Sequence, residues 1–125
     1  MSEMFWADSE DGTYKMKLKS LNLSNFETSK VKSMKAMFQN CINLENLDIS
    51  NFTTEMLTDT SYMFYNTSSS EVLLNKSLFS SVSNYADMFT NSTIEKISIN
   101  NSAQNFINSR LTEAGINPTL TVVSA

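Results

Sequence analysis

The chain has 125 residues, with 9 basic and 13 acidic side chains, no histidine, one cysteine and a formal net charge of −4. This length suits one domain with one core, while the lack of a basic run argues against nucleic-acid binding and the lack of an apolar run of about 18 residues argues against membrane insertion. Without histidine the usual general base and the commonest metal ligand are missing, so we expect no enzyme, no metal and no cofactor.

We interpret residues 1–18 as a partial repeat or cap that contains an insertion. Met4-Phe5 matches Met37-Phe38, but the 33 residues between Met4 and Met37 (37 − 4) exceed the later spacing by seven. We assign the excess to the acidic loop Ala7–Gly12. The amino end also lacks a basic stretch followed by an apolar one, so no export signal is expected in this chain.

Residues 19–100 form the core repeats, about four units in all. The segment that begins at Leu21 (L-N-L-S-N-F-E-T-S-K-V) returns at Leu47 (L-D-I-S-N-F-T-T-E-M-L), a period of 26 (47 − 21). Met63-Phe64 recurs at Met88-Phe89 after 25 residues (88 − 63). A fixed period in this range indicates a solenoid, in which each unit buries its apolar face only by stacking on its neighbours.

Each unit changes its hydrophobic period near its middle. Leu44, Leu47 and Ile49 have the spacing L-x-x-L-x-L, which ends in the alternation of a half-buried strand. The segment Val31–Cys41 has apolar residues at helical spacing. Thr28 and Ser29 precede it, and Thr53 and Thr54 precede the next such segment, as candidate N-caps. We therefore predict an α/β fold, with a parallel sheet on one side and one short helix per repeat on the other.

The third unit has two candidate registers, because either Val72 and Leu74 or Leu73 alone could face the core. A slip of one residue would turn the whole strand over. The last inward residue of a strand lies eight residues before the first apolar residue of the following predicted helix, as Ile49 does before Leu57 (57 − 49). Leu74 and Val82 have the same spacing (82 − 74). Val72 and Leu74 are therefore predicted to point inward and Leu73 outward.

Residues 101–125 are expected to form a carboxy-terminal cap, so that residues 1–125 make a single repeat domain. The inward strand residues should form two columns across the sheet, one of Leu21, Leu47, Val72 and Ile97 and one of Leu23, Ile49, Leu74 and Ile99. Leu120 and Val122 would continue these columns as a last strand, after Gly115 and Pro118. Cys41 cannot form an internal disulfide and is expected to be a small buried filler. The same expectation of burial holds for Phe26, Phe52 and four methionines on the predicted helices, namely Met34, Met37, Met63 and Met88.

The string L-x-L-S-N-F-x-T-S-x-V-x-x-M-x-x-M-F-x-x-C, filled here by Leu21–Cys41, resembles the repeat of the BspA-like leucine-rich-repeat surface proteins. The likeness is close over residues 21–64 and weaker to residue 99. The resemblance implies a leucine-rich-repeat-type solenoid, a role in adhesion or protein binding, and a cell-surface or secreted location. It implies no catalytic residue and no cofactor.

The predicted strand alternation leaves one side of the sheet available to a partner. This side is mostly small and polar, and Leu73 interrupts it as an outward apolar residue. Such an arrangement is typical of a binding centre with a polar rim, although a lone exposed leucine needs no explanation. The candidate partner-binding residues are Leu73, Asp48, Glu71, Lys96, Asn22, Asn46, Asn75 and Ser98.

Three functions agree with these features. The first is a non-catalytic protein-interaction or adhesion module that binds a protein partner through the exposed face of its repeat sheet. The second is a structural spacer in a surface stalk. The third is a small acidic intracellular regulator or inhibitor of an enzyme, possibly of phage type, that uses Asp8, Glu10 and Asp11.

Overall fold

The computed structural model describes residues 20–23, 26–42 and 44–124 of the chain. Its main element is a parallel sheet of five strands in sequence order, β1 (Ser20–Asn22), β2 (Leu44–Asp48), β3 (Ser68–Leu74), β4 (Thr93–Asn100) and β5 (Thr119–Val123). A 3-10 turn η1 (Asn101–Ala103) and a helix α1 (Gln104–Ala114) lie between β4 and β5. The fold is therefore α/β, with one sheet and one α-helix among the described residues.

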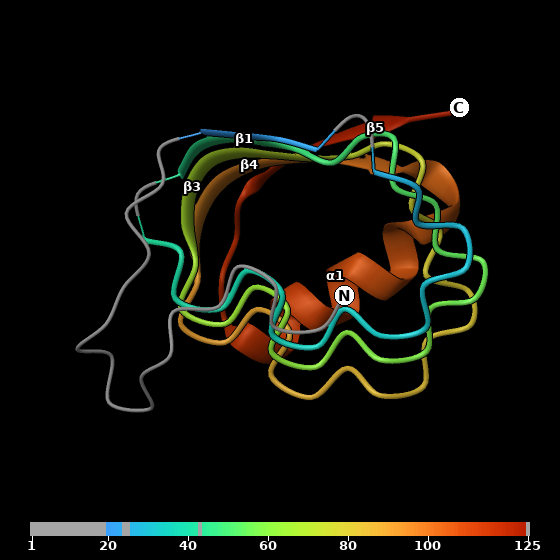
Figure 1. The fold of residues 1–125 in the computed structure, drawn as a ribbon. Coiled ribbons are helices and arrows are strands. Elements are labelled where there is room, and N and C mark those ends of the chain that lie inside the picture. Colours follow the sequence, from blue (N-terminus) through green and yellow to red (C-terminus); the bar gives the residue numbers. More distant parts are fainter. Residues whose placement is uncertain (1–19, 24–25, 43, 125) are drawn as a thin grey trace.

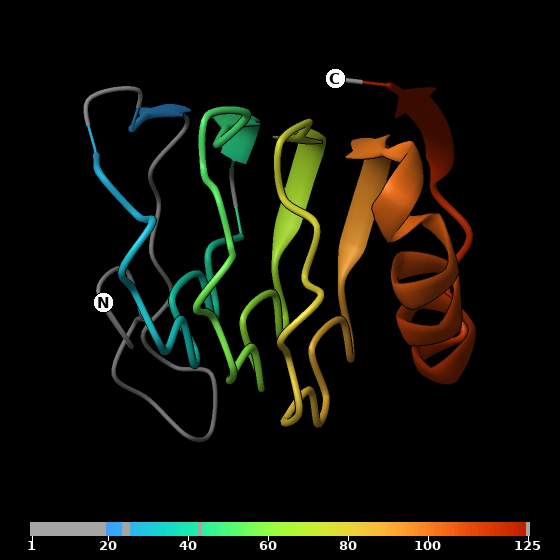
Figure 2. The same cartoon turned by 90° about the vertical axis from the view of Figure 1, so that its right-hand side faces the viewer.

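The segments that connect the strands follow one another as coils of nearly equal shape. Figure 1 looks along the row of coils, and the successive strands overlap at the top of the view while the connections overlap below. Figure 2 shows the same coils side by side, with α1 and β5 at the carboxy-terminal end. Each coil thus contacts mainly the one before it and the one after it.

The register of the sheet confirms the predicted inward columns. Leu47 pairs with Val72, Val72 with Ile97 and Ile97 with Leu120. The second column places Leu74 beside Ile99 and Ile99 beside Val122. Val72 and Leu74 are buried whereas Leu73 is only half-buried, so the third strand has the predicted register. At the end of the row, Leu120 is half-buried and Val122 is exposed.

The prediction of one short helix in each repeat is wrong. The described segments between β1 and β4 contain turns and isolated bridges instead, and Ala36 and Asn40 have left-handed backbones at φ 56° and 63°. Amides at alternate positions donate to the next coil, as from Met34 to the Asp59 carbonyl (2.9 Å) and from Phe38 to that of Met63 (3.0 Å). The backbone therefore pairs between coils rather than four residues back along its own coil.

The threonines that we expected to cap these helices bond between coils as well. The Thr28 hydroxyl accepts from the Thr53 amide (3.0 Å) and donates to the Thr53 carbonyl (3.1 Å). One coil further, the Thr54 hydroxyl accepts from the amides of Leu78 (3.0 Å) and Phe79 (2.8 Å). Short hydroxyl side chains can satisfy neighbouring backbone groups in turns as readily as at a helix terminus.

The core is a row of side chains that repeat from coil to coil. Phe38, Phe64 and Phe89 stack with centroids 5.6 and 5.2 Å apart and ring planes within 12°. Cys41 and Phe52 are buried as expected, but Phe26 is 36 % exposed. The remaining predicted core residues are buried, namely Met34, Met37, Met63 and Met88.

Helix α1, which the sequence analysis did not predict, packs on the last coil. Phe106 stacks on Phe79 at 5.3 Å and meets Tyr85 edge-on at 5.9 Å. The Arg110 guanidinium lies 3.7 Å from the Tyr85 ring centroid and pairs with Glu113 at 2.6 Å. The helix ends at Gly115, whose left-handed backbone (φ 71°) lets its amide bond to the last turn. Neither α1 nor any other described helix has the length and apolar character needed to cross a membrane.

Candidate functional site

The outer face of the sheet carries most of the predicted partner-binding residues. We define this outer face by the outward positions of β2, β3 and β4. The register places Asn46, Glu71 and Lys96 in one row across the three strands. A second row contains Asp48, Leu73 and Ser98 and continues to Thr121 of β5. Residues far apart in the sequence are thus brought together in two short rows.

Leu73 lies in the middle of the second row, and its neighbours hold their polar groups in fixed positions. Asp48 Oδ1 accepts from the amide (3.1 Å) and hydroxyl (2.6 Å) of Ser50. On the other side, Ser98 donates from its hydroxyl to Asn75 Oδ1 at 2.6 Å. Leu73 therefore has ordered polar groups on both sides, which is the arrangement of an apolar centre within a polar rim.

One predicted contact residue, Ser98, needs correction, and another, Asn22, is not tested. Ser98 is only 7 % exposed, so it supports the face from within and is not available to a partner. Its hydroxyl and the Asn100 side-chain amide both bond to Asn75, which ties β4 to the end of β3. Asn22 lies in β1 with its backbone in register with Asp48, but its side chain is outside the described part of the structure.

The remaining predicted residues differ in their exposure. Asn46 and Lys96 are exposed, while Glu71 is half-buried between them. Glu71 and Lys96 carry opposite charges at paired positions of neighbouring strands. The row thus presents an amide, a carboxylate and an ammonium side by side. The acidic residues Asp8, Glu10 and Asp11 lie outside the described residues.

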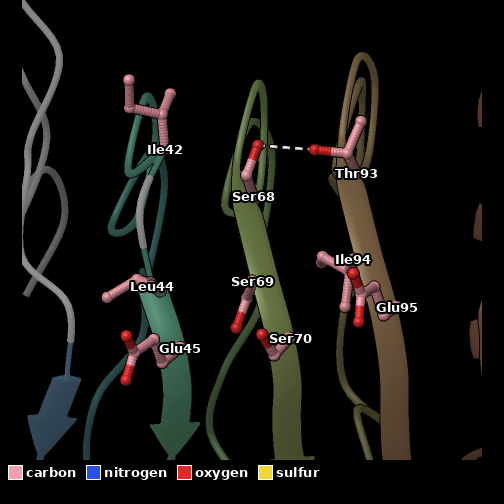
Figure 3. A pocket seen from close by; sticks show the side chains of 9 residues that line it. All are labelled: Ile42, Leu44, Glu45, Ser68, Ser69, Ser70, Thr93, Ile94 and Glu95. Carbon is pink, nitrogen blue, oxygen red and sulfur yellow. Dashed lines mark hydrogen bonds between the residues drawn. The ribbon is translucent and has the colours of Figure 1, made fainter.

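A second surface feature, which sequence reasoning missed, is an open groove at the amino-terminal ends of β2, β3 and β4. It has a volume of about 680 Å³, and Figure 3 shows its side chains on the three neighbouring strands. Ser68 and Thr93 bond through their hydroxyls at 2.5 Å at one end of the groove. Its lining residues are Ile42, Leu44, Glu45, Ser68, Ser69, Ser70, Thr93, Ile94 and Glu95.

The groove arises because each strand bends after its first buried residue. Leu44, Ser69 and Ile94 are buried and in register, and two outward residues follow each of them before the next buried one. This is the L-x-x-L part of the repeat. The residues just after the bend, Glu45 and Glu95, place carboxylates at opposite sides of the groove. Their spacing of 50 residues (95 − 45), two steps of 25, is the sequence signal that could have indicated this feature.

Groups with catalytic or metal-binding chemistry are sparse in the described part of the chain. No set of three or more cysteine, aspartate or glutamate side chains there is placed to hold a metal ion. Burial raises the pKa of the Cys41 thiol to about 12, so this group is a neutral core residue at ordinary pH. The amide of Ser29 donates to the exposed Glu27 carboxylate at 2.9 Å and lowers its pKa.

One family model matches the chain, over residues 1–106, and its description is "Mycoplasma protein of unknown function, DUF285". No curated protein and no solved structure gives a significant match. The matched region contains β1 to β4 and therefore both the outer face and the groove. The chain belongs to the DUF285 family.

Proposed function

We propose that this chain is a non-catalytic protein-interaction module that binds a protein partner through the outer face of its sheet. The observation that carries the proposal is the position of Leu73, half-buried between Asp48 and Ser98 in the middle strand of the face. An apolar side chain that is partly exposed at the centre of a rigid polar surface contributes most when a partner covers it.

The fold proposal that accompanies this function is a short solenoid of the leucine-rich-repeat type, of about four repeats. It is supported by side-chain bonds that join equivalent positions 25 or 26 residues apart, such as Asn66 to Asn40 (2.8 Å) and the bond between Ser68 and Thr93 (2.5 Å). Repeat arrays of this kind offer extended binding surfaces because each unit adds one strand to the same face.

The resemblance of Leu21–Cys41 to the BspA-like repeat supports an adhesive role, and with it a location at the cell surface or outside the cell. The chemistry of the outer face supports a protein as the partner. It offers amide, carboxylate and ammonium groups around one leucine, and such a mixture fits a folded protein surface better than a polyanion.

Site-specific photo-crosslinking tests the proposal. A photoreactive residue at position 73 should capture a partner from a surface extract of the source cell or its host, because this position is predicted to be covered in the complex. Position 78 is the matched control, since Leu78 is likewise a leucine with an accessible side chain (41 % exposed) but lies in a loop outside the sheet.

Capture through position 73 and not through position 78 supports the outer face. Capture of the same protein through position 78 alone would move the binding surface away from the sheet. If neither position captures a protein although the folded chain is retained on source or host cells, the outer face is not the contact surface.

A further inference from the structure

Strand β5 ends the described sheet with one of its edges unpaired. The described strands follow the order β1 to β5, so β5 bonds to β4 on one side and to no described strand on the other. In a strand, alternate backbone amides and carbonyls point to each side, so the free edge of β5 offers unpaired groups to another strand. An edge of this kind is a template for association.

The features that usually protect an edge strand are missing from β5. Its sequence is Thr-Leu-Thr-Val-Val, whose β-branched residues favour strand pairing. It contains no lysine, no other charged residue and no proline, the three substitutions that most often block pairing at an edge. Val122 is 41 % exposed at this edge.

The side chains of the carboxy-terminal segment, residues 101–125, carry no net charge. The chain carries a net charge of −4, but residues 101–125 contain only Arg110 and Glu113, and these two pair with each other at 2.6 Å. The exposed residues of α1 that have no charge are Gln104, Asn105, Asn108, Ser109 and Thr112. A second acidic copy of this chain is therefore repelled least at the end formed by α1 and β5.

The order of residues in β5 is compatible with pairing to itself. In an antiparallel pair with a two-fold axis at Thr121, Leu120 lies opposite Val122 of the second copy, and Thr119 lies opposite its Val123. Opposite residues in an antiparallel pair lie on the same side of the sheet. The inward side chains Leu120 and Val122 would thus meet each other, and the outward row would continue through the two copies of Thr121.

We propose that β5 is a homodimerisation edge, through which two copies of this chain pair antiparallel into one continuous sheet. A two-fold interface of this type uses the same surface on both copies and closes, so it makes a dimer rather than a filament. The dimer leaves Leu73 two strands away from the axis. The dimer proposal therefore does not depend on the protein partner proposed above, and each can be tested without the other.

Sedimentation velocity of the full chain tests this proposal. The weight-average mass should rise from that of one chain to that of two between about 1 and about 100 μM, the range in which interfaces of moderate affinity dissociate. Thr121→Lys places two lysine side chains across the two-fold axis, with their Cβ atoms about 5 Å apart, and the repulsion of their ammonium groups should raise the dissociation constant at least about ten-fold. Thr121→Glu should have the same effect.

An equimolar mixture of the Lys and Glu variants should regain the dimer, because opposite charges then meet at the axis. Ser80→Lys is the matched control, since Ser80 is an exposed turn residue far in sequence from β5, and it should dimerise as the unmodified chain does. Thermal melts establish that each variant is folded. A chain that stays monomeric over the whole range, a Thr121→Lys variant that still dimerises, or a mixture that stays monomeric would each overturn the proposal.

Discussion

Left-handed residues occupy equivalent corners in successive coils. Asn40, Asn66 and Asn91 have φ values of 63°, 54° and 60°, and they follow one another after 26 and then 25 residues. Asparagine tolerates this conformation better than other residues with a side chain, because its short amide can bond locally. The repeated asparagine therefore has a backbone reason, and the corner is part of how each coil turns.

Asn91 is exposed, so substitutions there report mainly on the backbone. Asn91→Ala should lower the free energy of unfolding by about 1 kcal/mol, because alanine disfavours positive φ. Asn91→Gly should leave it nearly unchanged. Urea titrations of the two variants check this, and equal midpoints would show that the corner does not constrain the residue.

The buried thiol of Cys41 makes stability depend on pH. Because burial raises its pKa from 9.0 to about 12, the unfolded chain loses the thiol proton at lower pH than the folded one. Stability is then complete below about pH 9 and falls as the pH rises from about 9 toward 12. Urea midpoints at pH 8 and pH 10.5 should differ more for the unmodified chain than for Cys41→Ala. Equal pH dependence would contradict the burial of a protonated thiol.

At the scale of elements, the strands were predictable and the connections were not. The alternation in Leu47 and Ile49 and the eight-residue spacing from Leu74 to Val82 were enough to place the inward columns. One spacing, that of Met34, Met37, Phe38 and Cys41, is compatible both with the apolar side of a helix and with a series of turns. Backbone pairing with the next coil decides between them, and a pattern of hydrophobic residues carries no information about that pairing.

Helix α1 shows the opposite case, in which a local signal was present. Phe106, Ile107, Arg110 and Leu111 have the spacing of one helix face, and Gly115 follows as a C-terminal signal. A helix was nevertheless not predicted there, because the apolar spacing of the preceding units does not continue into this segment. The outer face was predictable because it depends only on strand alternation, whereas the groove depends on a bend in each strand.

The stack of Phe38, Phe64 and Phe89 is the repeated element of the core. Phe64→Ala should lower the free energy of unfolding by about 3 to 5 kcal/mol, because the ring is fully buried between two others and its site cannot easily collapse. Phe26→Ala should cost clearly less, since that ring is 36 % exposed. Similar urea midpoints for the two variants would contradict the stacked arrangement.

At the scale of the whole molecule, three surfaces have separate properties. The outer face combines one leucine with fixed polar groups, the groove is lined by Glu45, Glu95 and several hydroxyl side chains, and the side chains of the carboxy-terminal end carry no net charge. The repeated coil explains the first two, because each coil contributes one equivalent position to every row, whereas the third is formed by α1 and β5. Changes in single coils therefore adjust one surface without altering the fold.

The central claim is that the outer face contacts a protein partner with Leu73 at its centre. Its most direct test is the affinity of the captured partner for Leu73→Ser, which copies the residue that the next coil has at the same position, Ser98. An aspartate at position 73 would instead add a second carboxylate beside that of Asp48, and serine avoids this repulsion. Leu78→Ser is the control. We predict that Leu73→Ser raises the dissociation constant at least about ten-fold, or about 1.4 kcal/mol, while Leu78→Ser leaves it unchanged. An unchanged affinity for Leu73→Ser, with the variant folded, would contradict the claim.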